Sequence, residues 1–197
     1  MNKLIVIATI SVLTAVAADE KVKPGDKTKP AAGMMTAPKP SAEARMLRDF
    51  LGTWKTVDSY EKIEGISPGG EGTSVITGTL GPGGYSILLN VRSTGGPMPT
   101  FRGMGIIAWS AEDKQYKEAW IDSMTPGLML ESGNKEGNDI VMHGEAKMGG
   151  KTIKVKDVIS DRTPTSYTLM SYMDDGSGEK KIMTIKATKE EKAPATK

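Results

Sequence analysis

The segment DFLGTWKTVDSYEK, Asp49 to Lys62, decides the fold because the spacing of its apolar residues changes within it. Before Gly52 the apolar residues recur at helical spacing, and from Thr53 onward they alternate with polar ones. Upstream, Ser41 is a good helix N-cap and Gly52 is a good helix stop. The sequence therefore predicts one short amphipathic helix over residues 42–51, followed by β-structure.

The rest of the chain predicts about ten short strands. The connections between them are short and rich in Gly, Pro, Asp and Asn, which favours tight turns and rules out the long crossovers of a parallel sheet. We expect a mainly β fold in which an antiparallel meander closes, or nearly closes, into a barrel, since closure removes exposed edges. The predicted strands are 53–63, 72–80, 85–94, 101–110, 115–124, 128–133, 139–148, 151–160, 166–173 and 180–188.

The N-terminus has the features of a secretory signal. Lys3 precedes an apolar run over residues 4–16, and small residues follow at Ala17 and Ala18. The run is too short to span a bilayer, so we expect a cleaved signal peptide, a secreted or periplasmic protein, and no integral membrane segment after cleavage. The predicted organisation is signal peptide 1–18, Lys/Pro-rich disordered tether 19–41, barrel domain 42–188 and polar tail 189–197.

Composition excludes several classes of function. The chain has 197 residues and no cysteine, so disulfides, thiolate metal sites and cysteine nucleophiles do not arise. The formal net charge is +2, yet residues 42–188 contain 17 basic and 19 acidic residues with the basic ones scattered. Nucleic-acid binding needs a concentrated positive surface, so we expect no nucleic-acid partner.

Two motifs carry a resemblance to known families. A short helix followed by Gly52-Thr53-Trp54 resembles the start of lipocalin-type barrels, in which the indole closes one end of the barrel. The stretch 103–133, GMGIIAWSAEDKQYKEAWIDSMTPGLMLESG, together with LRDFLGTWK, LGPGGY and HGEAKMGGK, resembles the bacterial family catalogued as domain of unknown function 1579. The resemblance covers about residues 44–188 and implies an exported calycin-like barrel. The family more often has Tyr or Phe in place of Trp109.

Several strings look catalytic and fail on physical grounds. GISPG at 65–69 matches a nucleophile elbow, but Pro68 has no N–H for an oxyanion hole. GMGIIA at 103–108 lies within an apolar strand and does not open a helix, as a dinucleotide site requires. His143 is the only histidine and shares a face with polar residues, so a haem or metal site is not expected. The thirteen methionines are scattered, which indicates lining of a core or cavity and not a copper site.

The favoured function is non-enzymatic binding of a small, largely apolar ligand inside the barrel, with no cofactor, metal or catalytic residue. Asp122 and Asp157 fall on mostly apolar faces, where Arg92 or Arg102 could supply counter-charges if the side chains point inward; bends in the strands could instead leave the aspartates in water. The predicted ligand-binding residues are Trp54, Arg102, Trp109, Trp120, Asp122, Met142 and Asp157.

Two alternatives stay open. One is a structural or cell-envelope interaction protein with a filled barrel. The other is an acid–base enzyme using interior carboxylates such as Asp122 and Glu118, which would need two of them close together with raised pKa values. The sequence does not determine the ligand or the oligomeric state.

Overall fold

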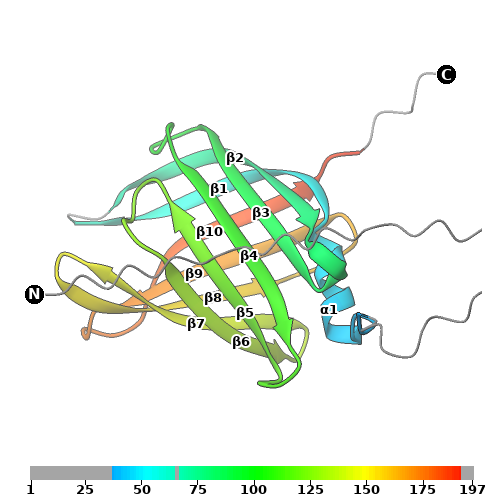
Figure 1. The fold of residues 1–197 in the computed structure, drawn as a ribbon. Helices are drawn as coiled ribbons and strands as arrows, with labels where there is room; N and C mark the ends of the chain where they lie inside the picture. The colour runs from blue at the N-terminus through cyan, green and yellow to red at the C-terminus, as the bar shows by residue number, and fades with distance from the viewer. Residues whose placement is uncertain (1–36, 65–66, 192–197) are drawn as a thin grey trace, which may run out of the picture. The chain divides into compact units, whose positions relative to one another are not determined.

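Ten antiparallel strands form a closed barrel in the computed structural model, which describes residues 37–64 and 67–191 (Figure 1). Each strand pairs with its neighbours in the sequence, and β1 pairs with β10 to close the barrel. The strands are β1 Gly52–Ile63, β2 Ser67–Leu80, β3 Ser86–Gly95, β4 Arg102–Ser110, β5 Gln115–Asp122, β6 Met129–Glu136, β7 Asp139–Met148, β8 Lys151–Ser160, β9 Ser166–Asp174 and β10 Lys180–Lys189. The predicted fold class is confirmed. The signal peptide and nearly all of the tether lie outside the described residues.

One short helical segment lies at one end of the barrel (Figure 1). α1 covers Ala42–Met46, and a 3-10 turn, η1, continues over Leu47–Phe50. The Ser41 hydroxyl accepts a hydrogen bond from the Ala44 N–H at 3.2 Å, as its N-cap position predicts. The sequence predicted a single helix through residue 51. In the structure its last turn is a 3-10 turn that ends at Phe50, and Leu51 is extended.

The helical segment is anchored where β1 begins. The Trp54 indole N–H donates to the Phe50 carbonyl at 3.1 Å. That carbonyl also approaches Gly78 on β2 so closely that a Cβ there would lie 2.1 Å from the oxygen. Gly52 turns the chain between the two elements with φ +108°, a conformation that favours glycine.

Three strand boundaries differ from the sequence prediction by more than one residue. SPGG, predicted as part of a turn, belongs to β2, where Pro68 pairs with Lys62. β6 runs past its predicted end at residue 133 to Glu136, because a tight turn at Gly137, with φ +62°, leads directly into β7. β5 stops at Asp122 and not at residue 124 because the Asp122 carboxylate accepts the N–H groups of the next turn.

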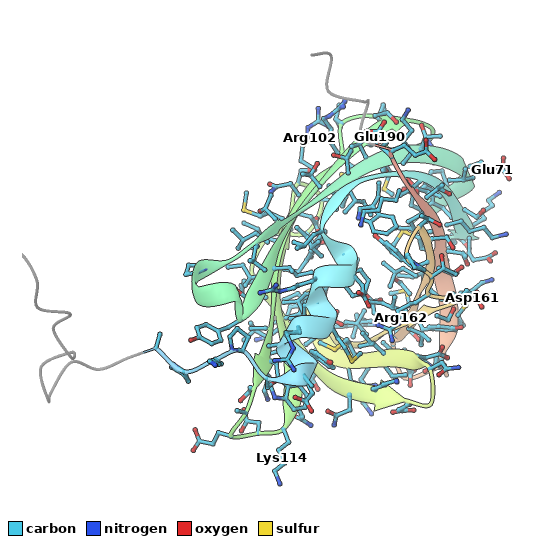
Figure 2. The ribbon with its side chains drawn as sticks, turned by 90° about the vertical axis from the view of Figure 1, so that its right-hand side faces the viewer. Glu71, Arg102, Lys114, Asp161, Arg162 and Glu190 are labelled. Atoms are coloured by element: carbon cyan, nitrogen blue, oxygen red, sulfur yellow. The ribbon has the colours of Figure 1, made fainter. Side chains whose placement is uncertain are left out.

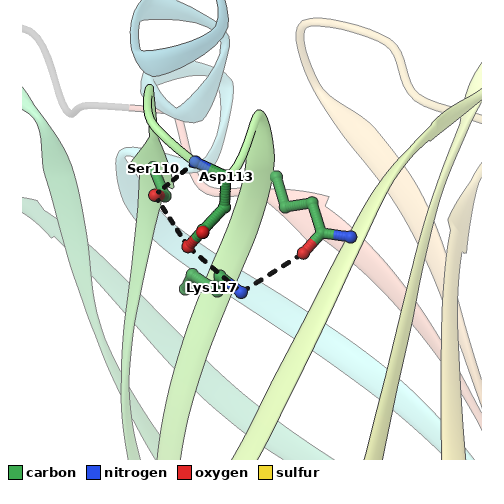
Figure 3. Close-up of polar contacts among 4 residues, drawn as sticks. Ser110, Asp113 and Lys117 are labelled. Carbon is green, nitrogen blue, oxygen red and sulfur yellow. Dashed lines mark hydrogen bonds and ion pairs between the residues drawn. The ribbon is translucent and has the colours of Figure 1, made fainter.

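The turn between β4 and β5 is held by local polar contacts (Figure 3). The Ser110 hydroxyl donates to Asp113 Oδ2 at 3.0 Å and accepts the Asp113 N–H at 3.2 Å. Lys117 forms an ion pair with the same carboxylate at 3.4 Å and donates to Gln115 Oε1. Lys114, inside the turn, has a positive φ of 54°. These contacts explain a tight hairpin without glycine at that position.

Alternation along the strands divides interior from exterior as predicted. On β7, Ile140 and Met142 are buried while His143 and Glu145 are exposed. The outer surface nevertheless carries a group of exposed apolar side chains on β4 to β6 and the adjoining loop. These are Met104, Ile106, Ile121, Met124, Leu128 and Leu130.

Candidate functional site

The interior of the barrel has two different halves. Under the helical segment a continuous apolar core fills it, formed by Leu47, Phe50, Trp54, Ile76, Ile87, Ile107, Tyr116, Ile140, Met142, Tyr167, Ile185 and Ala187. Toward the middle and the other end, inward-facing positions carry carboxyl and hydroxyl groups. These are Asp58, Ser74, Ser93, Glu118, Glu131, Asp157 and Ser171. The acidic half is the candidate site.

Trp54 closes the end of the barrel that carries the helical segment, as the Gly-x-Trp motif predicts. Its side chain is 1% exposed and packs edge-on against Tyr167, with ring centroids 5.0 Å apart. Met142 is equally enclosed at 2% exposure. Both side chains therefore form the floor of the interior and present almost no surface to a ligand.

Trp109 and Trp120 occupy different levels of the barrel. Trp109 is half-buried near the floor and packs edge-on against Tyr116 at 4.9 Å. Trp120 is half-buried higher in the interior and lies flat on β4, where Cβ atoms at Gly103 and Gly105 would come within 2.3 Å and 2.7 Å of its ring. The two glycines make room for the indole.

Asp122 lies on the same face of β5 as Trp120, but both of its carboxylate oxygens already accept hydrogen bonds from the protein. Oδ2 accepts the Trp120 indole N–H at 3.0 Å, and Oδ1 accepts the backbone N–H groups of Met124 at 2.8 Å and Thr125 at 2.7 Å. It fixes the orientation of Trp120 and ends the strand. A role as a free ligand anchor would require breaking these bonds.

Arg102 does not lie in the interior. Its side chain is exposed on the outer side of β4, donates to the Phe101 carbonyl at 2.8 Å, and appears at the margin of the barrel when the helical end faces the viewer (Figure 2). Arg92, its cross-strand partner, is exposed as well. The expectation of an arginine counter-charge inside is wrong, because both residues fall on the outward phase of their strands.

Three carboxyl groups come together in the middle of the barrel. Glu118 on β5 and Glu131 on β6 are direct cross-strand partners. Asp157 projects inward from β8, two strands further along. Gly144 on the intervening strand has no side chain, and a Cβ there would lie 2.6 Å from Glu131 Cγ. The missing side chain leaves room for Glu131 to fold toward Asp157.

Glu131 is the most confined member of this carboxyl trio, Glu118, Glu131 and Asp157. It is 4% exposed, and neither carboxyl oxygen has a hydrogen-bond partner among the described residues. No ion pair between described residues includes a member of the trio. A buried polar group without a partner is costly, typically by about 1–3 kcal/mol, so this arrangement needs an explanation.

The pKa values of the trio are all raised. Burial raises the pKa of Glu118 to about 8, and the negative charge of Asp157 adds to the effect. The pKa of Glu131 rises to about 9 through burial and then through the charges of Asp157 and Glu118. The pKa of Asp157 rises to about 6 through burial, while Ser171 acts in the opposite direction. At neutral pH two members therefore hold protons and the trio carries about one negative charge.

Glu118 and Asp157 lie among protein atoms on the inner face of the barrel, yet neither residue is completely buried. Trp120 and Met129, which also face inward, are partly exposed too. At these positions the acidic half is therefore less completely enclosed than the floor, where Trp54 and Met142 are 1% and 2% exposed.

A fourth interior carboxylate, Asp58 on β1, has partners of its own. It is 0% exposed and accepts hydrogen bonds from Ser74 Oγ at 2.5 Å and the Tyr60 hydroxyl at 3.4 Å. Burial, followed by the Asp58 charge, raises the pKa of both Tyr60 and Tyr167. Asp58 Oδ1 has no partner in the described part of the chain.

The sequence prediction included Asp157 and mentioned Glu118, but it missed Glu131 and Asp58. Both could have been found from alternation alone. Asp58 follows Trp54 and Thr56 on one face of its strand, and Glu131 lies between Met129 and Gly133. Of their neighbours on that face, Trp54, Thr56 and Gly133 are buried in the structure and Met129 is partly exposed.

Other candidate features lie outside the barrel. His143 is exposed and lines an outer groove of about 580 Å³ with Leu128, Leu130, Gly144, Glu145, Lys154 and Val155. In residues 37–64 and 67–191 no three His, Asp or Glu side chains are placed so that they could hold a metal ion. No helix in these ranges is long and apolar enough to cross a membrane.

Comparison with known proteins locates the chain among barrel proteins. Residues 39–189 match the family model described as "Protein of unknown function (DUF1579)". The solved structure of an S-type phycobiliprotein lyase, CPES from Guillardia theta, is similar in fold with a TM-score of 0.52 and 13% sequence identity. The similarity covers 75% of this chain and 92% of that chain. A search of curated proteins gives no significant match.

Proposed function

Since the chain belongs to the DUF1579 family and folds as a closed calycin-like barrel, we propose that it is an exported, non-enzymatic protein that binds a small, largely apolar ligand in its interior. The observation that carries this proposal is the accessible surface kept by inward-facing side chains in the acidic half, including Glu118, Trp120 and Met129. Barrels with such an interior commonly hold one small ligand.

The alternative function, a structural protein with a filled barrel, is supported only by the half of the interior that lies under the helical segment. The floor, built around Trp54, is packed in the way a structural barrel would be. The acidic half keeps accessible surface on both apolar and carboxyl side chains, which favours a ligand there over a purely structural interior.

Export is supported by the basic, apolar and small-residue pattern of residues 1–18. Expression of the full chain in a bacterium, followed by mass spectrometry of the protein from the periplasm, tests it. We expect a mature N-terminus at Asp19. An intact Met1 terminus on protein retained in the cytoplasm would contradict export.

Ligand binding is tested by the melting temperature of the purified full chain. The probes are a fatty acid, an isoprenoid alcohol, haem and an alkylamine, each in excess. A ligand at 100 times its Kd adds about 2.7 kcal/mol to the free energy of unfolding, so a clear rise in Tm is expected for at least one probe. No rise with any of the four would overturn the proposal.

A matched pair of variants locates the binding. Val155→Trp places a large side chain into the interior from β8, whereas Lys154→Trp places it on the outer face one residue earlier. We expect Val155→Trp to abolish the ligand-induced rise in Tm and Lys154→Trp to leave it unchanged. Equal loss in both variants would place the ligand elsewhere.

One observation favours a second candidate, an acid–base enzyme. Glu118 and Glu131 are cross-strand partners with raised pKa values, the arrangement that general acid–base chemistry near neutral pH uses. The two functions differ in the fate of the bound molecule. Mass spectrometry of each stabilising probe after long incubation should recover it unchanged for a binding protein, and chemically altered for an enzyme.

A further inference from the structure

We propose that the carboxyl trio recognises a single ammonium group on an otherwise apolar ligand, so that the barrel is a receptor for amphiphilic amines. This inference rests on the proposed function and adds the chemical class of the ligand. It is carried by two independent observations: the convergence of Glu118, Glu131 and Asp157 on one region of the interior, and the absence of any described partner for the carboxyl group of Glu131.

The convergence follows from the register of the sheet. Glu118 and Glu131 are opposite each other on β5 and β6, and Gly144, the partner of Glu131 on β7, leaves the wall bare two residues from Met142, the partner of Asp157. The charge of Asp157 adds to the raised pKa of both Glu118 and Glu131, and the charge of Glu118 adds to that of Glu131, as expected for groups that lie near one another. An ionised carboxylate can only accept hydrogen bonds, so a cationic donor is its natural partner.

The charge inside the acidic half has one sign. The positions facing the trio from the adjoining strands are apolar or hydroxyl-bearing, namely Ile107, Met142, Val155 and Ser171, and Asp58 faces the interior from β1. The basic residues on the same strands, such as Lys117, Lys154 and Lys156, lie on the alternate, outward phase. A ligand anion would meet uncompensated repulsion, whereas a cation would supply the missing counter-charge.

An ammonium group suits this geometry better than a metal ion does. Within the described ranges no three acidic or histidine side chains are set closely enough for a metal ion. An ammonium group has three N–H donors on one centre and can hydrogen-bond carboxyl oxygens that approach from different strands. The trio carries about one negative charge at neutral pH, which matches one monovalent cation.

The apolar surroundings determine the rest of the ligand. Trp120 lies beside Glu118, since a Cβ added to Gly105 would contact the indole at 2.7 Å and Glu118 Oε1 at 3.2 Å. An indole next to a carboxyl group is a favourable place for a cation, because the ring face adds a cation–π attraction. The partly exposed Met129 offers apolar surface for a hydrocarbon chain.

Binding of an amine should be linked to proton release. Glu118 and Glu131 hold protons at neutral pH in the free protein, and an ammonium ion favours their ionised forms. Affinity for the amine should therefore rise as pH increases from 6 to 8. An uncharged ligand of the same size should show no such dependence.

The test compares octylamine, 1-octanol and octanoate by isothermal titration calorimetry on the full chain at pH 7. We expect octylamine to bind at least tenfold more tightly than octanol, and octanoate to bind more weakly than octanol. Titration in phosphate and in Tris, which differ in ionisation enthalpy, should show release of protons with octylamine only.

Two variants and one control assign the effect to the trio. Glu131→Gln and Asp157→Asn should each lower octylamine affinity at least tenfold and leave octanol affinity unchanged. Glu145→Gln, on the outer face of β7, should change neither. Circular dichroism and melting curves establish that each variant is folded.

The outcomes separate this inference from the proposed function. Equal affinity for octylamine, octanol and octanoate in the wild-type chain would overturn amine recognition and leave interior binding intact. Unchanged octylamine affinity in both folded trio variants would do the same. No binding of any of the three probes, combined with no stabilisation by the wider panel, would overturn the proposed function and this inference together.

Discussion

Glu118 and Glu131 are direct cross-strand partners on β5 and β6, and both side chains point into the barrel. Like charges directly opposite each other on one face of a sheet are destabilising. The protein tolerates the pair because burial and the neighbouring carboxylates hold both groups in their protonated form near neutral pH. The relationship makes the interior sensitive to pH, and it is the basis of the first prediction.

Stability should fall as pH rises from about 5 to about 9. Between about pH 5 and their folded-state pKa values of about 8 and 9, Glu118 and Glu131 are protonated in the folded chain but ionised in the unfolded chain, where a glutamate titrates near 4.5. The folded state therefore binds more protons, and each such group lowers the free energy of unfolding by up to about 1.4 kcal/mol per pH unit. The loss ends above the folded-state pKa values.

Urea unfolding of wild-type protein and Glu131→Gln between pH 5 and 9 measures this slope. Glutamine keeps the shape of a protonated glutamate and cannot ionise, so we expect a shallower slope and a more stable variant at pH 8. A wild-type profile that is flat over this range, or a variant with the wild-type slope, would contradict the raised pKa of Glu131.

Gly103→Ala should displace Trp120. The added Cβ would lie 2.3 Å from Cζ2 of the indole, closer than unstrained contact permits. Overpacking of this kind costs about 1–3 kcal/mol, and a shift in tryptophan emission should accompany it. Gly95→Ala is the control, since its Cβ would meet only Thr73 Oγ1, at 3.2 Å. Equal effects in the two variants would show that the indole does not lie on β4.

Trp54→Ala should be among the most destabilising single changes in the barrel. The side chain is 1% exposed, donates to the Phe50 carbonyl and packs against Tyr167. Truncation of a buried Trp typically costs about 3–5 kcal/mol. Val57→Ala, at a position on the same strand that is 52% exposed, should cost much less. Urea denaturation of both variants compares them, and similar costs would argue against Trp54 as the floor of the barrel.

Asp122→Ala should act on stability and not on ligand binding. It removes the acceptor for the Trp120 indole and for two backbone N–H groups, at a cost of about 1–3 kcal/mol. Asp122→Asn keeps one acceptor oxygen and should fall between the alanine variant and wild type. Calorimetry with octylamine gives the second readout. Normal stability with lost affinity would identify Asp122 as a ligand anchor after all.

Much of this architecture could be predicted because it depends on local patterns. Alternation of apolar and polar residues gave ten strands with boundaries close to those observed, and the change of period at Gly52 located the helical segment. Short connections left an antiparallel meander as the available topology. The outward position of His143 also followed from alternation.

The sequence predictions failed where contacts of individual side chains, and not the alternation of apolar and polar residues, determined the local structure. β5 ends at Asp122 because that carboxylate caps the next turn, and Pro68 is accommodated in β2 opposite Lys62. Arg102 looked like a counter-charge for interior acids, yet its strand phase turns it outward. Alternation places Glu131 on one face with Met129 and Gly133, a signal that is easy to overlook in so short a strand.

The sequence by itself determined that the chain after Gly52 forms a two-faced β-meander closed at one end by Trp54, because alternation and turn chemistry are local properties of the chain. Only the tertiary structure decided which acids meet. Glu118 and Glu131 lie on consecutive strands and Asp157 follows on β8, and they converge because the register of β5 to β8 and the missing side chain of Gly144 bring them to one region of the interior. Register between strands depends on the packing of the whole barrel, so no short stretch of sequence encodes it.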